Sequence, residues 1–311
     1  MRFRAVVSEV STFVQIVQSI SKLSKKCILK FSADKMHLIC HDETEGGVQV
    51  WSQVNQDLIF SSYRIESNQA NEIHISILIQ PLLTVLKSAL ALEGKGEVVV
   101  KLAKRPVGQP TALTGSEPGA PAVMKPMLVW EIGGDSRLNR PPPLSHELHI
   151  KVLKTPEVEQ LKEPLCPEPD IHIVLPPLSS LRTVTDHLSR LSSHVSVSAN
   201  NLGELKLEAG RDERNGVEVR TSWKGLNVPK VNSDSQSTQD RSQPPPGHFF
   251  NTLVSIKSLL RFLNAHCIQG STIACICENH SLIIYLYIGD MVQNGGVLTF
   301  FIPAVILDED D

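Results

Sequence analysis

The chain has 311 residues, of which 41% are hydrophobic and 20% charged, and its formal net charge is −3. This composition is that of an ordinary globular protein and excludes a wholly disordered chain, which would be poorer in apolar residues. The slightly acidic balance excludes a uniformly basic nucleic-acid-binding surface, although it allows a local basic stripe. At roughly 150 residues per domain, the length predicts about two domains.

One unit recurs along the chain: a short strand, an amphipathic helix and three further strands. In chain order, the first copy has strands at 2–7, 27–31, 36–40 and 48–54, and its helix carries Phe13, Ile16, Val17 and Ile20. The second has strands at 71–77, 97–102, 126–132 and 146–153, and its helix begins near Pro81 and carries Leu82, Val85, Leu86 and Leu90. Apolar side chains spaced in this way predict one buried helix face, and the alternation in the other segments predicts half-buried strands.

The second half of the chain repeats the pattern twice more. The third copy has strands at 170–176, 194–199, 204–209 and 217–223, with helical residues Leu178, Leu181, Val184, Leu188 and Leu191. The fourth has strands at 249–255, 271–278, 280–288 and 297–302, with helical residues Ile256, Leu259, Leu260, Phe262 and Leu263. We therefore expect an α+β protein of two similar domains, each built from two copies of the unit.

The composition between these segments places the loops and the domain boundary. Loops are expected at 103–121, 135–144 and 227–247, where Pro and Gly are frequent or apolar residues are scarce. Four prolines within 153–170 predict an extended connector. The predicted organisation is an N-terminal domain at 1–152, a connecting loop at 153–169 and a C-terminal domain at 170–311.

Cysteine usage and hydropathy predict an intracellular protein. Six cysteines are spread thinly along the chain and no secretory signal is visible, so reduced thiols are expected. The longest apolar run, 282–288, is far shorter than the ~20 residues of a membrane-spanning helix.

Six strings stand in a characteristic order along the chain: MRFRA (1–5), FSADKMHLICHD (31–42), GGVQVW (46–51), KEPLCPEPDIHIVLPPL (162–178), LSSHVSVSANNLGELKLEA (191–209) and FFIPAVI (300–306). This ordered set resembles the sliding DNA clamps, and most closely the Hus-one subunits of the heterotrimeric DNA-damage checkpoint clamp, the nine-one-one complex. The resemblance implies a PCNA-like fold and a non-enzymatic ring subunit that needs no cofactor or metal. It also implies a nuclear protein, present in the cytoplasm too, whose partners are Rad-nine-like and Rad-one-like subunits, a clamp loader, and repair and checkpoint proteins.

Charge is distributed as a ring around DNA would require. The four helical segments, counted generously, carry eight basic and two acidic side chains, a net +6, which leaves −9 for the rest of the chain. Basic helices on an acidic protein suit a ring whose helices line the hole and bind duplex DNA without sequence preference. The side chains expected to face DNA are Lys22, Lys25, Lys26, Lys87, Arg182, Arg190, Lys257 and Arg261.

Two further sites are expected, one by resemblance and one from strand edges. In clamps, client peptides dock between the connector and the last strand. The matching residues here are Val158 and Leu161 on the connector and Phe301 and Pro303 on the last strand. The competing interpretation is that Phe301 belongs to the ordinary core.

A ring closes by pairing edge strands, and we expect 146–153 and 217–223 to be those edges. The residues expected at the subunit interface are Ile150, Val152, Val217 and Val219.

Two alternatives remain open from the sequence. A homotrimeric replication clamp would share the fold. A metal enzyme using Cys275, Cys277 and His280 is disfavoured, because a C-x-C pair within a strand is better explained as buried core and no second ligand pair lies nearby in the sequence.

Overall fold

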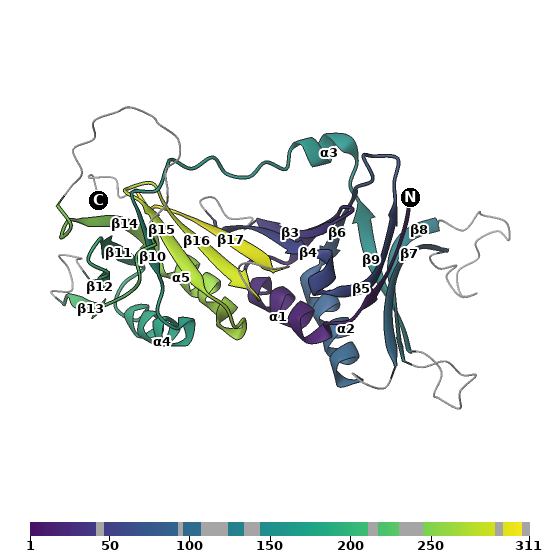
Figure 1. Ribbon diagram of the computed structural model, residues 1–311, viewed down its shortest axis with the longest axis horizontal. Coiled ribbons are helices and arrows are strands. Elements are labelled where there is room, and N and C mark those ends of the chain that lie inside the picture. Colours follow the sequence, from purple (N-terminus) through teal and green to yellow (C-terminus); the bar gives the residue numbers. More distant parts are fainter. Residues whose placement is uncertain are drawn as a thin grey trace, which may run out of the picture. The chain divides into compact units, whose positions relative to one another are not determined.

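The computed structural model describes residues 1–41, 47–92, 96–106, 124–133, 144–210, 217–229, 245–289 and 295–306 (Figure 1). Most of each predicted loop lies outside these residues. The chain forms two compact units: one comprises Met1–Val17, Lys25–Ile39 and Gln53–Lys162, and the other comprises Gln18–Ser24, Cys40–Ser52 and Glu163–Asp311.

The first half of the chain contains the first two predicted copies. Its elements are β1 (Arg2–Val7), α1 (Val10–Ile20), β2 (Lys26–Phe31), β3 (Lys35–His41), β4 (Gln49–Asn55), η1 (Gln56–Leu58), β5 (Phe60–Glu66), β6 (Ile73–Leu78), α2 (Ile79–Ala91), β7 (Glu97–Pro106), β8 (Met124–Gly133), β9 (Leu144–Val152) and α3 (Thr155–Glu159). The strand order in the first unit is β2-β6-β9-β8-β7-β1-β5. Its core forms where Phe13 of α1 packs against Trp130 of β8 and Phe60 of β5.

The second half contains the other two copies. Its elements are β10 (Ile171–Val174), α4 (Leu178–Leu188), β11 (His194–Asn200), β12 (Leu205–Ala209), β13 (Val219–Trp223), β14 (Phe249–Ser255), α5 (Ile256–Phe262), η3 (Leu263–Cys267), β15 (Thr272–Cys277), β16 (Ser281–Ile288) and β17 (Gly296–Pro303). Strands β10-β15-β16-β17 lie in that order, and a separate sheet has the order β13-β12-β11-β14.

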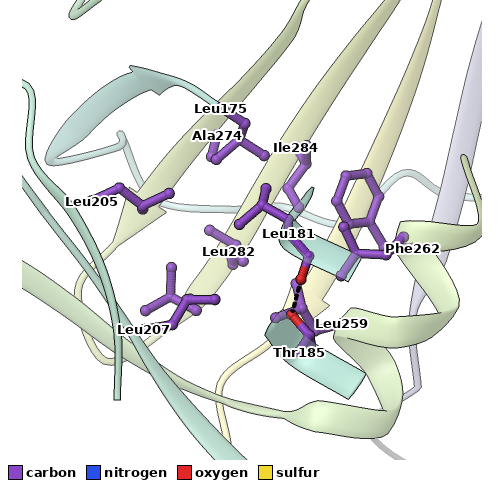
Figure 2. Close-up of a pocket in the computed structure, with 12 residues that line it drawn as sticks. Leu175, Leu181, Thr185, Leu205, Leu207, Leu259, Phe262, Ala274, Leu282 and Ile284 are labelled. Atoms are coloured by element: carbon purple, nitrogen blue, oxygen red, sulfur yellow. Dashed lines mark hydrogen bonds between the residues drawn. The ribbon is translucent and has the colours of Figure 1, made fainter. Parts of the chain in front are cut away.

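The helices of the second unit cover an apolar core (Figure 2). Leu181 of α4, Phe262 of α5 and Leu282 of β16 line a cavity of about 20 Å³ there. Thr185 is the polar lining residue, and its Oγ1 donates to the Leu181 carbonyl oxygen at 2.8 Å within the same helix. A buried hydroxyl is thereby satisfied without a partner in the core.

Three elements depart from the sequence prediction. Strand β5 was not expected, because its burial does not alternate cleanly. The connector was expected to be extended, yet its start forms α3 with Pro156 in the first turn, where a proline costs no hydrogen bond. The 3₁₀ helix η3 continues α5 for one further turn. Among the described residues, no helix is long and apolar enough to cross a membrane.

Candidate nucleic-acid interface

Helices α4 and α5 of the second unit pack against each other and present a polar groove on their exposed side. Each helix follows a strand almost directly, α4 after Pro176 and Pro177, and α5 straight from β14. Leu178, Leu181 and Leu188 face the core from α4, so the intervening polar positions are left on the outside.

The groove has a volume of about 550 Å³ and combines basic and small polar side chains. Its lining consists of Lys22, Arg182, Asp186, Ser189, Ser192, Ser193, His194, Ser255, Ile256, Lys257, Leu260, Arg261 and Asn264, all of the second unit. Four of the predicted DNA-facing residues therefore converge on one surface: Lys22, Arg182, Lys257 and Arg261. Guanidinium and ammonium groups with neighbouring hydroxyls are the donors that bind phosphate oxygens.

Arg182 is held in a defined position. Its Nη1 donates to Asn264 Oδ1 at 2.8 Å, and the Asn264 amide nitrogen donates to the carbonyl oxygens of Leu260 and Arg261. The asparagine thus connects the end of α5 to a guanidinium on α4. An arginine that is already oriented loses less side-chain entropy when it binds a phosphate.

One carboxylate opposes the basic groups of the groove. Asp186 lies on α4 one turn from Arg182, and its Oδ2 is 3.9 Å from Arg190 Nη2. Both side chains are exposed, so this ion pair contributes little to stability. Arg190 lies beyond the end of α4 and is not among the groove residues.

Lys22 reaches the groove from the turn after α1. The other predicted DNA-facing residues are exposed but do not line the groove: Lys87 lies on α2, Lys25 just before β2, and Lys26 at the first position of β2. Only four of the eight predicted residues therefore lie within helices. The sequence reasoning missed Asn264 and the serines of the groove, because neither type has a helical periodicity or a charge that could have identified it.

Phe301 of the predicted client pocket lies within an apolar cluster on one face of the second unit's sheet. It is buried with Cys275, Cys277 and Ile283, and Trp51, Cys166, Ile273 and Tyr285 pack against this cluster. Pro303 ends β17 and is half-buried, as are Val158 of α3 and Leu161. The connector residue that packs on the Phe301 cluster is Cys166, which the sequence reasoning did not select.

The predicted edge at 146–153 is wrong over its last residues. Ile150, Lys151 and Val152 of β9 pair with Ile77, Ser76 and Ile75 of β6, while the other side of β9 pairs with β8. Ile150 and Val152 therefore have no free backbone edge towards β6, and their role at the subunit interface stays a prediction. Leu144–His149, by contrast, pairs with β8 alone among the described strands.

Strand β13 lies at the end of its four-stranded sheet and pairs with β12 only, as the edge prediction required. Val219 opens this strand opposite Ala209, and Val217 precedes it with an exposed side chain. Strand β13 and the first part of β9 are thus two of the described segments that pair on one side only, as β5, β10 and β14 also do at the ends of their sheets.

Sequence comparison places the chain among known proteins. Residues 1–306 match the family described as Hus1-like protein. The chain is 29% identical over 312 residues to Checkpoint protein hus1 of Schizosaccharomyces pombe, covering 98% of this chain and 100% of that protein. It is 27% identical over 311 residues to Checkpoint protein HUS1 of Homo sapiens, again covering 98% of this chain and 100% of the relative.

Solved structures identify the fold independently. The proliferating cellular nuclear antigen (PCNA) of Entamoeba histolytica aligns with a TM-score of 0.65 at 14% identity, covering 98% of this chain and 99% of that one. PCNA of Thermococcus kodakaraensis aligns with a TM-score of 0.64 at 18% identity, covering 97% of this chain and 99% of the other. The resemblance inferred from local strings is confirmed over almost the whole length: the chain has the PCNA-like sliding-clamp fold and belongs to the Hus1-like protein family.

Proposed function

We propose that this protein is a non-catalytic subunit of a ring-shaped heterotrimeric DNA-damage checkpoint clamp. The observation that carries the proposal is the match to the Hus1-like family over residues 1–306, together with a PCNA-like fold. In this ring the other two subunits are Rad-nine-like and Rad-one-like relatives. A clamp loader places the ring on DNA, and the ring recruits checkpoint and repair proteins in the nucleus, with a further pool of the subunit in the cytoplasm.

Duplex DNA is the ligand of the α4–α5 groove. Arg182, Lys257 and Arg261 supply positive charge there. Contacts of this kind are made to phosphates, so binding is independent of sequence and weakens steeply with salt. Lys22 contributes to the same groove, and Lys25, Lys26, Lys87 and Arg190 are further DNA contacts in this proposal.

Ring closure uses the segments whose backbone is unpaired in the chain alone. Strand β13, including Val219, pairs with one neighbour, and Leu144–His149 of β9 pairs with the other. Backbone hydrogen bonds set the geometry of such pairing, and side chains select the partner. The side chains available for selection include Glu147 and His149 on β9, and Arg220 on β13, which is held by Glu218 at 2.8 Å.

Client peptides dock near Phe301 and Pro303 on the sheet of the second unit, with Val158 and Leu161 on the connector side. Replacing Val158 and Leu161 together with Asp introduces charge at half-buried apolar positions. This double variant should lose peptide binding while ring assembly is retained. Unchanged affinity for client peptides, measured by fluorescence polarisation, would remove this part of the proposal.

Co-purification tests the central proposal. The chain expressed with one Rad-nine-like and one Rad-one-like subunit should elute as one complex with a one-to-one-to-one composition. The homotrimeric replication clamp is the second candidate, favoured by the alignment with PCNA structures. A stable homotrimer of the isolated chain would support that candidate instead.

The metal-enzyme alternative has less support. The pKa of Cys275 is raised to about 12, by burial and by the neighbouring Cys277, so its thiolate is costly to form at neutral pH. Cys275 and Cys277 lie in the apolar cluster around Phe301. Metal analysis of the purified chain would settle the point, since stoichiometric zinc would favour an enzyme or a structural metal site.

A further inference from the structure

Three contacts hold the end of the connector beside β15 in the second unit. The Asp170 backbone N–H donates to the Ile276 carbonyl oxygen at 2.9 Å, and the Asp170 carboxylate accepts from the Glu278 N–H at 2.8 Å. Cys277, the residue before Glu278, donates from its thiol to the Pro167 carbonyl oxygen at 3.6 Å. Residues 167–170 are therefore fixed along the last residues of β15.

This anchoring brings a second thiol onto the same face. Cys166 directly precedes Pro167, is half-buried, and packs against the cluster that contains Cys277, Cys275 and Phe301. All three cysteines are free thiols in the structure. Cys277 is the better placed of the two strand cysteines, because its sulfur already points at the connector backbone.

We propose that Cys166 and Cys277 form a reversible disulfide under peroxide stress, which fastens the connector to the sheet of the second unit. Hydrogen peroxide oxidises the half-buried Cys166 thiol to a sulfenic acid and is itself reduced to one water. The Cys277 sulfur then attacks the Cys166 sulfur and forms the S–S bond. The hydroxyl of the sulfenic acid leaves and combines with the proton of the Cys277 thiol to give a second water. A dithiol reductant reverses the bond by exchange.

The order of the two steps follows from the surroundings of each sulfur. The pKa of Cys277 is raised chiefly by burial, partly offset by its hydrogen bond with Ser281, and raised further by Cys166 and Asp170. Cys277 is thus a poor first target for peroxide, whereas Cys166 reaches solvent. Because the attack needs the Cys277 thiolate, disulfide formation should accelerate as pH rises above neutrality.

The disulfide would restrict the movement of the connector. In the reduced chain, residues 166–170 are held by three polar contacts and by packing, all of which can break and re-form. A covalent bond between residues 166 and 277 removes that freedom and closes a long loop, which stabilises the folded chain. The second unit would then carry a fixed connector in oxidising conditions and a movable one in reducing conditions.

The test uses the full chain treated with hydrogen peroxide and then mapped by mass spectrometry without reduction. Trypsin separates the two cysteines, because lysines and arginines occur between them. We expect a linked peptide pair containing Cys166 and Cys277, a higher midpoint of thermal unfolding, and reversal of both by dithiothreitol. Cys166→Ser should abolish the linked pair, as should Cys277→Ser.

Cys275→Ser is the matched control, since it removes a thiol from the same strand and face. This variant should still form the linked pair, which also assigns the bond to Cys277. Cys166→Ser affects a half-buried position in the connector, so its folding can be verified by an unchanged unfolding midpoint in reductant. Recovery of Cys166 as a sulfinic acid with Cys277 still a free thiol would overturn the proposal, as would a bond to Cys275.

Discussion

At the scale of single residues, the groove on α4 and α5 depends on a few cations. Lys257 is exposed on α5, and Arg261 lies one turn further along the same helix. Reversing both charges, Lys257→Glu with Arg261→Glu, should remove about two phosphate contacts. The slope of log affinity against log salt for duplex DNA should then fall in magnitude by about 2.

The matched control reverses two exposed lysines that do not line the groove, Lys104→Glu with Lys162→Glu. These variants change the net charge of the chain by the same amount. Titrations of the assembled ring with duplex DNA at several salt concentrations compare the two. Equal losses in both double variants would mean that overall charge, and not the groove, governs DNA binding.

The surroundings of His74 predict how the stability of the folded chain depends on pH. It is buried on β6, with 6% of its surface exposed, and its Nε2 lies 3.7 Å from Glu72 Oε2. Burial lowers its pKa most, the charge of Lys30 lowers it further, and Glu72 partly opposes both. Neutral His74 is therefore the form that the folded chain favours.

The folded chain should lose stability as the pH falls. Because the pKa of His74 is lower in the folded state, its contribution to stability is fully present above the unfolded value of about 6.5 and is lost as pH falls through the folded value. His74→Gln should flatten this acid loss, measured by urea unfolding between neutral and mildly acidic pH. An identical pH profile in the variant would show that His74 is not responsible.

At the scale of elements, α4 shows how one helix serves both core and groove. Its inner face carries Leu181 and Thr185, which line the apolar cavity (Figure 2). Leu181→Ala should lower the free energy of unfolding by roughly 2–5 kcal/mol, because it enlarges a cavity in packed core. Thr185→Val keeps the shape and loses one local hydrogen bond, so it should cost only about 1 kcal/mol. Urea unfolding compares the two variants, and equal losses would mean that the cavity wall is not tightly packed.

Strand β9 gives a prediction about ring assembly. The Leu153 N–H donates towards β6, to the His74 carbonyl oxygen. Backbone direction alternates along a strand, so the Glu147 N–H points to the same side, where β9 has no partner strand among the described residues. Glu147→Pro should therefore block one subunit interface while the chain itself stays folded.

Glu147→Ala separates the backbone effect from the side chain, since it removes the 3.0 Å ion pair with Arg105 but keeps the N–H. Size-exclusion chromatography with the two partner subunits should show assembly for the alanine variant and an incomplete ring for the proline variant. Complete rings with Glu147→Pro would exclude this part of β9 from the interface.

The same elements explain what sequence reasoning could predict. Strand and helix periodicity located both units, because burial in β1 and α1 follows the alternation and helical spacing directly. Periodicity does not say which strands become neighbours, so the pairing of Ile150 with Ile77 was missed. The role of Asn264 depends on a contact across 82 residues, which no local pattern encodes.

At the scale of the whole molecule, the central claim is that this chain is one of three different subunits in a ring. The unpaired segments of β9 and β13 should find partners on relatives and not on copies of the chain. Light scattering coupled to size-exclusion chromatography measures this most directly, first on the chain alone and then with Rad-nine-like and Rad-one-like subunits. We predict the mass of a single chain alone and the summed mass of three different chains in the mixture. A stable homotrimer of the isolated chain, or no change in mass on mixing, would contradict the account.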